Sequence, residues 1–361
     1  MAGFAAHEIF GREVFGKFTN EELLGIVEEH EGIFGIGCQG PDLFLYDLPM
    51  LACGRERNVG ARMHQEGTAR FFAYLWQTVW EADSSLKMEV GLAYLYGALA
   101  HYTLDTMMHP YIYARIGYDP DVPYSKRATR GLHHRLEAAI DAKLLSLKSD
   151  ALPSQYKPCE YMETNRKERE CLADILVKAV GRTYKVRLKR ENVFGAIKMM
   201  RMIACGFYGG SEKKRKELEK WEHRISEYGL FSNLMVTDDD IRKRKVMNHE
   251  KMPWKNPWDS SRESQDSVWE IYGKAVGRYG QYRKEFEQLE EWVLGRREEL
   301  ILKEEKGNRK IHVMGKGGKK KDNTSVIMEQ PNREREEEVC AEIRRSVRKM
   351  GNLSYYSGLP L

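Results

Sequence analysis

The sequence predicts an all-α fold. Three observations support this prediction: apolar residues recur at helical spacing along most of the chain, period-two alternation is nearly absent, and the candidate helices are bounded by capping residues or proline. A chain of 361 residues with 42% hydrophobic residues can bury a substantial core. We therefore expect a multi-helical domain with additional C-terminal helices.

The helices are predicted from local patterns along the chain. Asn20 is a suitable N-cap for a helix over 21–29. Four apolar side chains at helical spacing indicate a helix over 66–82. Residues 86–108 form an unusually apolar helix, and we expect Pro110 to end it because proline lacks an amide donor. Further helices are predicted over 132–147, 168–186, 193–207, 212–226, 265–276 and 282–303.

The domain organisation follows from these elements. We expect residues 1–305 to form one helical domain. Residues 1–145 should hold a metal site, and residues 150–305 should supply the helices that complete the domain. Residues 306–332, which contain the run GKGGKKK, are predicted to be a flexible basic linker, and 333–361 a C-terminal helix and tail. We expect three long irregular stretches, at 39–59, 111–130 and 247–264. Loops of this length are often functional.

Charge and cysteine content limit the binding partners and the cellular location that we expect. The net charge of +5 lies entirely in 301–361, which hold 14 Lys and Arg against 9 Asp and Glu, so the neutral body argues against a nucleic-acid partner. The six cysteines include no CxxC pair, and we expect them to be reduced. Without a signal peptide or a bilayer-length apolar stretch, we expect a cytoplasmic protein. Protein partners are not indicated.

Three ionisable side chains interrupt the most apolar part of the chain: His101, Asp105 and His109. They are spaced four residues apart, and four residues turn a helix by 360° plus about 40°. All three side chains therefore project from one side of the helix. Their neighbours are Tyr, Leu, Ala and Met, so this helix should be buried, and an unpaired buried carboxylate is costly. A metal ion would compensate Asp105, and a hydrogen-bonded His–Asp pair is the alternative.

Five more candidate ligands lie outside this helix. His133 and Glu137 are four residues apart, which suits a two-ligand zinc clip and is also common in surface pairs. Upstream, His7, Asp42 and His64 would each alone be a cap, turn or surface residue. As a set, however, they supply nitrogen and oxygen ligands without thiolate, which is typical of hydrolytic rather than structural zinc.

The motifs occur in the order AAHEIFG, QGPD, MH, HYTLDTMMHP and HHRLE within residues 1–145. This order resembles the zinc-dependent phospholipase C family, and most closely its intracellular branch of phospholipase C/D domain proteins. The resemblance implies a multi-helical zinc phospholipase C-like domain with two or three Zn²⁺ ions. It implies one ion at Asp42, His64, His101 and Asp105, a second at His109, His133 and Glu137, and a third at His7 and Asp105.

The secreted members of the family use an N-terminal tryptophan as a further ligand. This chain begins MAGF, so we expect fewer ligands for the third ion. The resemblance implies hydrolysis of a phosphodiester, with phospholipid as the expected substrate. A metal-activated water would attack the ester, and Asp42 would act as base in addition to its ligand role.

Other functions remain open at this point. The segment with Trp254 and Trp258 could make peripheral membrane contact, although we prefer a loop that covers the core. A zinc-dependent nuclease or nucleotidase is the first alternative function, because fungal single-strand nucleases share a similar trinuclear zinc fold. A non-catalytic protein that holds zinc in closed coordination is the second.

Overall fold

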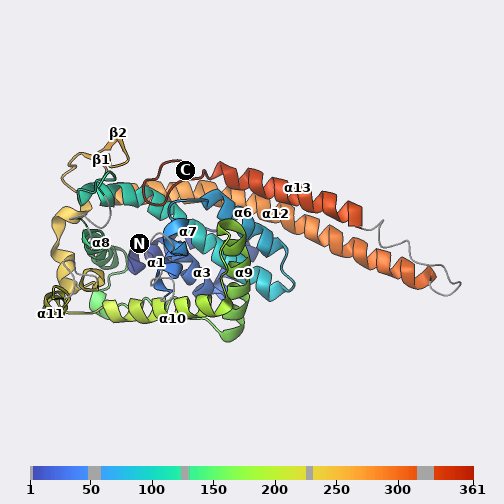
Figure 1. Ribbon diagram of the computed structural model, residues 1–361, viewed down its shortest axis with the longest axis horizontal. Helices are drawn as coiled ribbons and strands as arrows, with labels where there is room; N and C mark the ends of the chain where they lie inside the picture. The colour runs from blue at the N-terminus through green and yellow to red at the C-terminus, as the bar shows by residue number, and fades with distance from the viewer. Residues whose placement is uncertain (1–2, 48–57, 123–128, 130, 225–230, 315–328) are drawn as a thin grey trace.

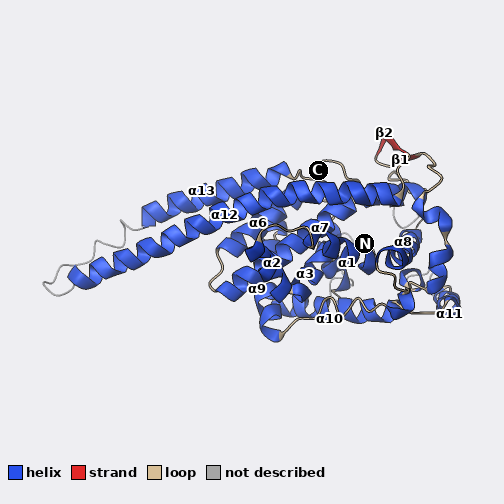
Figure 2. Cartoon of the chain, turned by 180° about the vertical axis from the view of Figure 1, so that it is seen from behind, coloured by secondary structure: helices blue, strands red, loops and turns tan. Residues whose placement is uncertain are grey.

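The computed structural model describes residues 3–47, 58–122, 129, 131–224, 231–314 and 329–361. In these ranges the chain is mostly helical, with one small two-stranded hairpin, which confirms the prediction of a mainly helical fold (Figures 1 and 2). None of the helices described there has the length and apolar character needed to cross a membrane.

The first half of the chain is arranged around one long helix. Its elements are α1 (Phe4–Phe15), α2 (Glu21–Glu29), α3 (Glu31–Cys38), the 3-10 helix η1 (Gly40–Tyr46), α5 (Val59–Met63), α6 (Thr68–Trp80), α7 (Ser85–Arg115) and α8 (Leu132–Lys148). The long helix α7 contacts α1, α2, α3, α6, α8 and α9, and is buried along most of its length. It is the central element of the fold and carries the ionisable triad.

The second half of the chain encloses this centre. It comprises the 3-10 helix η3 (Pro153–Gln155), α9 (Arg166–Tyr184), α10 (Arg190–Phe207), α11 (Glu212–Glu222), the 3-10 helices η4 (Ser232–Leu234), η5 (Asp238–Arg242) and η6 (Arg244–Met247), strands β1 (Trp254–Asn256) and β2 (Asp259–Ser264), α12 (Val268–Met314) and α13 (Glu329–Lys349). The two last helices lie side by side and extend beyond the body (Figures 1 and 2). Val339, Ile343 and Val347 of α13 nevertheless join the common core.

The prediction that Pro110 ends the central helix is wrong, because α7 continues through it to Arg115. Proline removes one amide donor, which leaves the carbonyl of Thr106 outside the helical hydrogen-bond ladder. Gly358 of the C-terminal tail lies against that carbonyl oxygen, so closely that a Cβ at this position would clash. Packing of the tail at this place therefore accommodates the proline within the helix.

Three α-helices of the described residues were not predicted, namely α1, α3 and the short α5. The sequence of α3, EGIFGIGC, is rich in glycine, which lowers helix propensity. The structure explains the glycines by close packing: a Cβ at Gly37 would lie 2.5 Å from the carbonyl oxygen of Tyr94 on α7. Tertiary packing against α7 thus overrides the weak local preference.

The C-terminal elements differ from the prediction in their bounds. Residues expected as two helices form the single helix α12, and Gly277 and Gly280 lie inside it with open space around them. Residues 306–314 of the expected linker continue α12, and 329–332 begin α13, because extending an existing helix costs little for Lys- and Glu-rich sequence. Residues 315–328 lie outside the described residues.

The irregular stretch 247–264 contains the hairpin, in which Trp254 pairs with Ser264. Trp254 packs on Tyr111 with ring centroids 5.6 Å apart, and Trp258 packs on Tyr113 at 5.0 Å. Both tryptophans are partly buried, in keeping with a segment that covers α7.

One cysteine prediction is wrong. Cys159 and Cys205 form a disulfide with Cα atoms 5.5 Å apart, within the usual range for such a bond. Cys38, Cys171 and Cys340 are free. The pairing escaped prediction because the two positions are 46 residues apart in sequence and share no motif.

Candidate metal centre

Asp105 on α7 is the centre of a buried cluster of histidines and carboxylates. It is fully buried, and its two oxygens point at different imidazoles. Oδ1 lies 3.2 Å from Nε2 of His7, and Oδ2 lies 3.0 Å from Nε2 of His101. The His7 and His101 rings stack with centroids 4.2 Å apart. The i, i+4 spacing on α7 brings His101 to Asp105, and α1 delivers His7 from the start of the chain.

A second set of ligands adjoins the first through His101. Asp42 on η1 has Oδ1 3.1 Å from Nε2 of His64, and Oδ2 of Asp105 lies 3.9 Å from the same nitrogen. With His101, Asp42 and His64 form a group whose ligand atoms all lie within 4.8 Å of one another. Asp42 is 2% exposed and His64 is fully buried.

Local sequence explains how Asp42 and His64 reach this place. Gly40 has a φ of +50°, and a Cβ there would lie 2.5 Å from Cδ2 of His101, so the turn before Asp42 requires glycine. Asn58 caps α5 by accepting a hydrogen bond from the Ala61 amide at 3.0 Å. The same side chain donates to the carbonyl oxygen of Phe44 at 3.2 Å, which ties α5 to η1.

The third set of ligands joins α7 to α8. Glu137 Oε1 lies 2.7 Å from Nε2 of His133, one helical turn earlier, and 3.4 Å from Nε2 of His109. All three side chains are buried. The neighbouring His134 reaches the other oxygen of Glu137, with Nδ1 3.5 Å from Oε2. The structure therefore places all eight predicted ligands in three groups, each of which could hold a metal ion.

The backbone fixes the tautomer of three of these histidines. Nδ1 of His64 lies 2.7 Å from the carbonyl oxygen of Gly60, and Nδ1 of His101 lies 3.1 Å from that of Cys38. Nδ1 of His109 lies 2.7 Å from the carbonyl oxygen of Tyr355. A carbonyl oxygen only accepts, so each Nδ1 carries the proton and, in the neutral ring, each Nε2 presents a lone pair. Such contacts are typical of histidines that bind metals.

When the rings are neutral, these lone pairs meet the carboxylate oxygens with no hydrogen between them. In the described part of the chain, Nε2 of His64 and His101, Oδ1 of Asp42 and both oxygens of Asp105 have no hydrogen-bond partner. Buried acceptors that face one another at 3.0–3.1 Å repel unless a proton or a metal cation lies between them. Ligands of a tetrahedral ion at about 2.0–2.1 Å are roughly 3.3 Å apart, so the residues present fit a divalent cation.

Protonation differs among the histidines of the cluster. Burial alone would lower the pKa of His101, but the adjacent Asp105 raises it, so a metal ion bound there would displace a proton. Burial lowers the pKa of His7 to about 4 and that of His133 to about 3, which keeps both rings neutral at pH 7. Burial alone would raise the pKa of Asp105, but the adjacent His101 and His109 hold it well below its usual value. Glu137 is held well below its usual pKa in the same way, against burial, by His133. Neutral imidazoles and ionised carboxylates are the forms that bind metal.

Sequence reasoning missed the residues that surround the cluster. The ring of Tyr356 stacks on His64 with centroids 5.0 Å apart, and Tyr355 lies 5.2 Å from the same ring. Asp141, one turn after Glu137 on α8, accepts hydrogen bonds from the amides of Ala5 and Ala6 at 3.2 and 3.0 Å and so fixes the start of α1. A carboxylate four residues after Glu137 on the same helix face was a usable signal for Asp141, whereas the YY pair offered none.

A small cavity of about 30 Å³ lies beside Glu137. Aromatic and aliphatic side chains make up most of its wall, among them Phe4, Tyr46, Phe207 and Leu234. Its volume suits one or two water molecules. The described residues therefore leave a narrow, mainly apolar space next to the third ligand group.

Comparison with known proteins identifies no relative of this chain. No protein-family model matches the chain, and neither the curated proteins nor the solved structures contain a match.

Proposed function

We propose that this protein is a zinc-dependent phosphoesterase, with phospholipase C-like hydrolysis of a phosphodiester as its activity. The observation that carries the proposal is the set of unpartnered lone pairs on His64, His101, Asp42 and Asp105, which converge in a buried space. The order of the ligand motifs along the chain, which resembles that of the zinc-dependent phospholipases C, supports it.

Each group of residues has a role in this proposal. Two of the groups would share His101, and the third, at His109, His133 and Glu137, would hold a separate ion. Divalent ions there would neutralise charge on a phosphate and lower the pKa of water for attack. Asp42 is our candidate to accept the proton of that water, since Oδ1 has no hydrogen-bond donor among the described residues.

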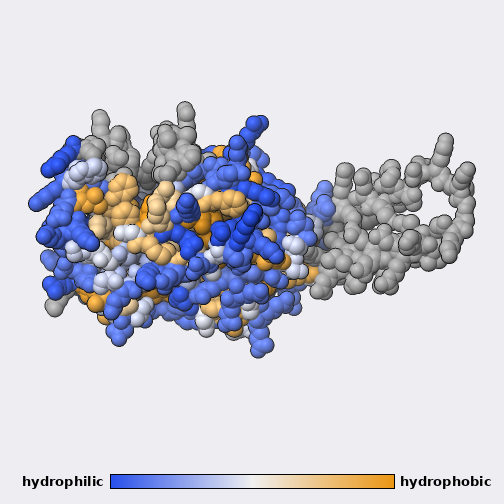
Figure 3. All heavy atoms as spheres, turned by 90° about the horizontal axis from the view of Figure 1, so that it is seen from below, coloured by the Kyte–Doolittle hydropathy of each residue, from blue (hydrophilic) through white to orange (hydrophobic). Residues whose placement is uncertain are grey.

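The surface near Glu137 supports a substrate with an apolar part. The adjoining cavity has mainly apolar walls but, at about 30 Å³, is too small for a lipid chain, which would have to lie on the surface outside it. Met202 on α10 and Phe231 are 58% and 44% exposed. Hydrophobic residues also gather on the face that carries α10 (Figure 3). A phospholipid has both a phosphodiester and an apolar body, which favours it over nucleic acid.

The test combines a metal count with an assay. Elemental analysis of the purified protein should find two or three zinc ions, and p-nitrophenyl phosphorylcholine should be hydrolysed in preference to single-stranded DNA. Asp105→Asn should lose metal and activity together. Glu290→Gln, which alters a buried carboxylate outside the cluster, should keep both. Preferential cleavage of DNA would contradict the phospholipase C-like proposal, and so would a metal-free protein.

A second candidate function is a non-catalytic metal-binding protein of the same fold. The observation that favours it is burial: seven of the eight ligands, all except His133 at 8%, are at most 4% exposed. Structural zinc sites are closed, whereas catalytic sites keep an open position. Bound zinc without turnover of any phosphate ester would favour this second function.

A further inference from the structure

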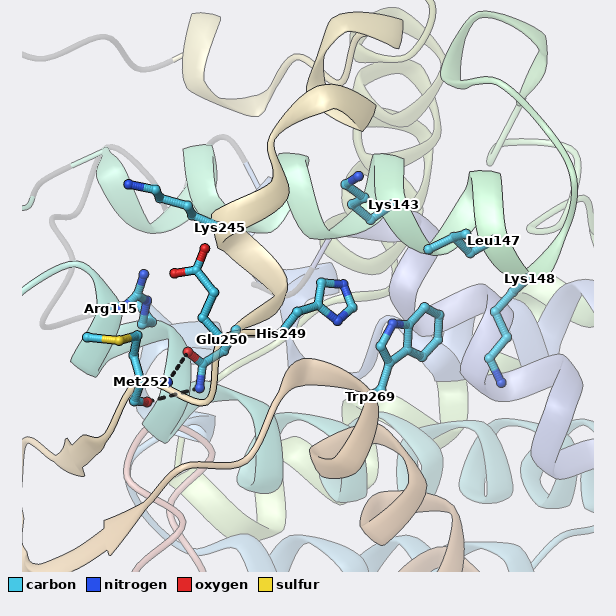
Figure 4. A pocket seen from close by; sticks show the side chains of 10 residues that line it. Arg115, Lys143, Leu147, Lys148, Lys245, His249, Glu250, Met252 and Trp269 are labelled. Carbon is cyan, nitrogen blue, oxygen red and sulfur yellow. Dashed lines mark hydrogen bonds between the residues drawn. The ribbon is translucent and has the colours of Figure 1, made fainter.

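A second, larger cavity lies outside the metal centre. It has a volume of about 950 Å³, within the size range of small-molecule sites. Its walls are the C-terminal parts of α7 and α8, the segment 245–252 and the first turn of α12 (Figure 4). None of the eight metal-ligand candidates lines it.

The rim of this cavity is strongly basic. Arg115, Lys143, Lys148 and Lys245 line it, against the single acid Glu250. Lys148 is already engaged, with Nζ 2.5 Å from Oε2 of Glu13 and 4.5 Å from the ring centroid of Tyr272. Among the described residues, no carboxylate forms an ion pair with Arg115, Lys143 or Lys245, so within this part of the chain three cations at the cavity edge lack a counter-ion.

The middle of the cavity is apolar. Trp269 and Leu147 point into it between the cationic side chains, and Met252 closes one end (Figure 4). Leu147 and Met252 are 59% and 51% exposed, so both side chains are accessible to a ligand in the cavity. The cavity therefore combines a basic rim with an uncovered apolar floor.

The wall at 248–252 is held in shape by Asn248. This buried residue has a φ of +53°, and its Oδ1 accepts a hydrogen bond from the Met252 amide at 3.1 Å. Its Nδ2 lies 3.0, 3.3 and 3.2 Å from the carbonyl oxygens of Met252, Gln265 and Asp266. All four contacts are internal, so the wall is preformed for a ligand.

We propose that this cavity binds a phosphate-bearing amphiphile. The rim supplies Arg115, Lys143 and Lys245 for the phosphate, and Trp269 with Leu147 and Met252 supplies an apolar or aromatic surface for the body of the ligand. An anionic phospholipid in a membrane and a soluble aryl or alkyl phosphate share this chemistry. A ligand with both parts would contact the cations and the apolar floor together, whereas a neutral or a purely anionic ligand would use only one of these two features.

This site is separate from the proposed phosphoesterase centre. Arg115 follows His109 by six residues on α7, and Lys143 follows Glu137 by six residues on α8. Six residues correspond to about 9 Å along a helix and about 240° around it. The two helices thus present ligands to the metal centre on one face and to the basic cavity on another, so binding here does not depend on the activity of the metal centre.

The test measures binding by two probes. The full chain is sedimented with phosphatidylcholine vesicles, with and without phosphatidic acid, and is titrated with 1-naphthyl phosphonate, a soluble analogue that resists hydrolysis. Binding to one of the two probes should fall more than about tenfold in the double variant Lys143→Glu/Lys245→Glu. The matched control is Lys178→Glu/Lys198→Glu, which changes the net charge equally on exposed positions that do not line the cavity.

Each outcome has a distinct meaning. Vesicle binding that needs phosphatidic acid and is lost only in the cavity variant supports the proposal with a lipid as the source. Phosphonate binding lost only in the cavity variant supports it with a soluble ligand. Equal loss in the control, or no binding of either probe, overturns it. Hydrolysis of p-nitrophenyl phosphorylcholine, measured in the same preparations, tests the metal centre independently.

Discussion

Nδ1 of His109 lies 2.7 Å from the backbone carbonyl oxygen of Tyr355, 246 positions later in the chain. The amide of the same residue, Tyr355, donates a hydrogen bond to the carbonyl oxygen of His64 at 3.0 Å. One residue of the C-terminal tail therefore contacts two candidate ligands from different groups. Metal binding and docking of the tail should be coupled as a consequence.

Removal of residues 352–361 should weaken metal binding by about 10–100-fold, the usual effect of losing a partner that orients a metal ligand. Without the Tyr355 carbonyl oxygen, the His109 ring loses the contact that fixes its tautomer. Competition with a chromogenic zinc chelator would measure the change in affinity. Circular dichroism of the truncated protein would establish that it retains its helices.

A point variant separates this effect from general instability. Gly358→Ala would place a Cβ against the Thr106 carbonyl oxygen at a φ of +62°, and so should displace the tail while leaving its sequence present. Its metal affinity should fall in the same direction as that of the truncation. Leu361→Ala, at an exposed end position, should bind metal as the wild type does. Equal affinity in the wild type, the truncated protein and Gly358→Ala would remove any role of the tail.

Much of the helical fold could be predicted from local sequence, because long apolar periodicity identified α6, α7 and α8 within a few residues, apart from the C-terminal end of α7. The errors came from tertiary contacts. Pro110 is tolerated because the tail packs against Thr106, and the glycines of α3 serve its close approach to α7. Neither contact leaves a periodic signal in the sequence.

The candidate site was likewise predictable only in part. Five ligand positions on α7 and α8 could be selected because ionisable residues in apolar segments are costly and residues at i, i+4 spacing share a helix face. His7, Asp42 and His64 were selected only as members of a set whose motif order resembles a known family. The partners of the ligands could not be predicted: Cys38, Gly60 and Tyr355 act through backbone carbonyls, which any residue possesses. The basic cavity also joins residues from four segments, and its charge pattern exists only after folding.

The unfolding temperature should respond to metal removal in the wild type but not in Asp105→Asn. An ion at a thousandfold excess over its Kd stabilises the native state by about 4 kcal/mol, and this is lost on addition of EDTA. In EDTA, Asp105→Asn should be less stable than the wild type. Burial alone would raise the pKa of Asp105, but His101 and His109 hold it well below its usual value, so the native state favours the ionised carboxylate. Differential scanning calorimetry with and without EDTA would measure both effects. A wild type indifferent to EDTA would contradict the metal centre.

Gly97→Ala should destabilise the protein by about 1–3 kcal/mol through overpacking. A Cβ at Gly97 would clash with the carbonyl oxygen of Phe34 and approach the Cys38 amide to 2.9 Å, which would push α3 away from α7. His101 lies one turn further along α7, so metal affinity should fall as well. Urea denaturation measures the stability change. Gly273→Ala on the exposed face of α12, with nothing near its Cβ, should be neutral or stabilising, and a similar loss in both variants would refute the packing argument.

Stability should fall as pH rises from about 5 to 7 because of Glu290. Burial, with Glu22 and Glu287 nearby, raises the pKa of this carboxyl from 4.5 to about 7, although the Tyr96 hydroxyl donates a hydrogen bond to it at 2.6 Å. Between these two pKa values the native state binds more protons than the unfolded chain, so the free energy of unfolding decreases with rising pH. The full shift corresponds to about 3 kcal/mol.

Glu290→Gln tests this origin of the pH dependence, because it keeps the shape of the side chain and removes the charge. At pH 5 the variant and the wild type should unfold at similar urea concentrations. At pH 8 the variant should be more stable by up to about 3 kcal/mol, since only the wild type then buries an ionised carboxylate beside Tyr96. The exposed neighbour Glu291, changed to Gln, should follow the wild type at both pH values. A stability difference between Glu290→Gln and the wild type that does not change with pH would show that Glu290 is ionised in the native state throughout this range.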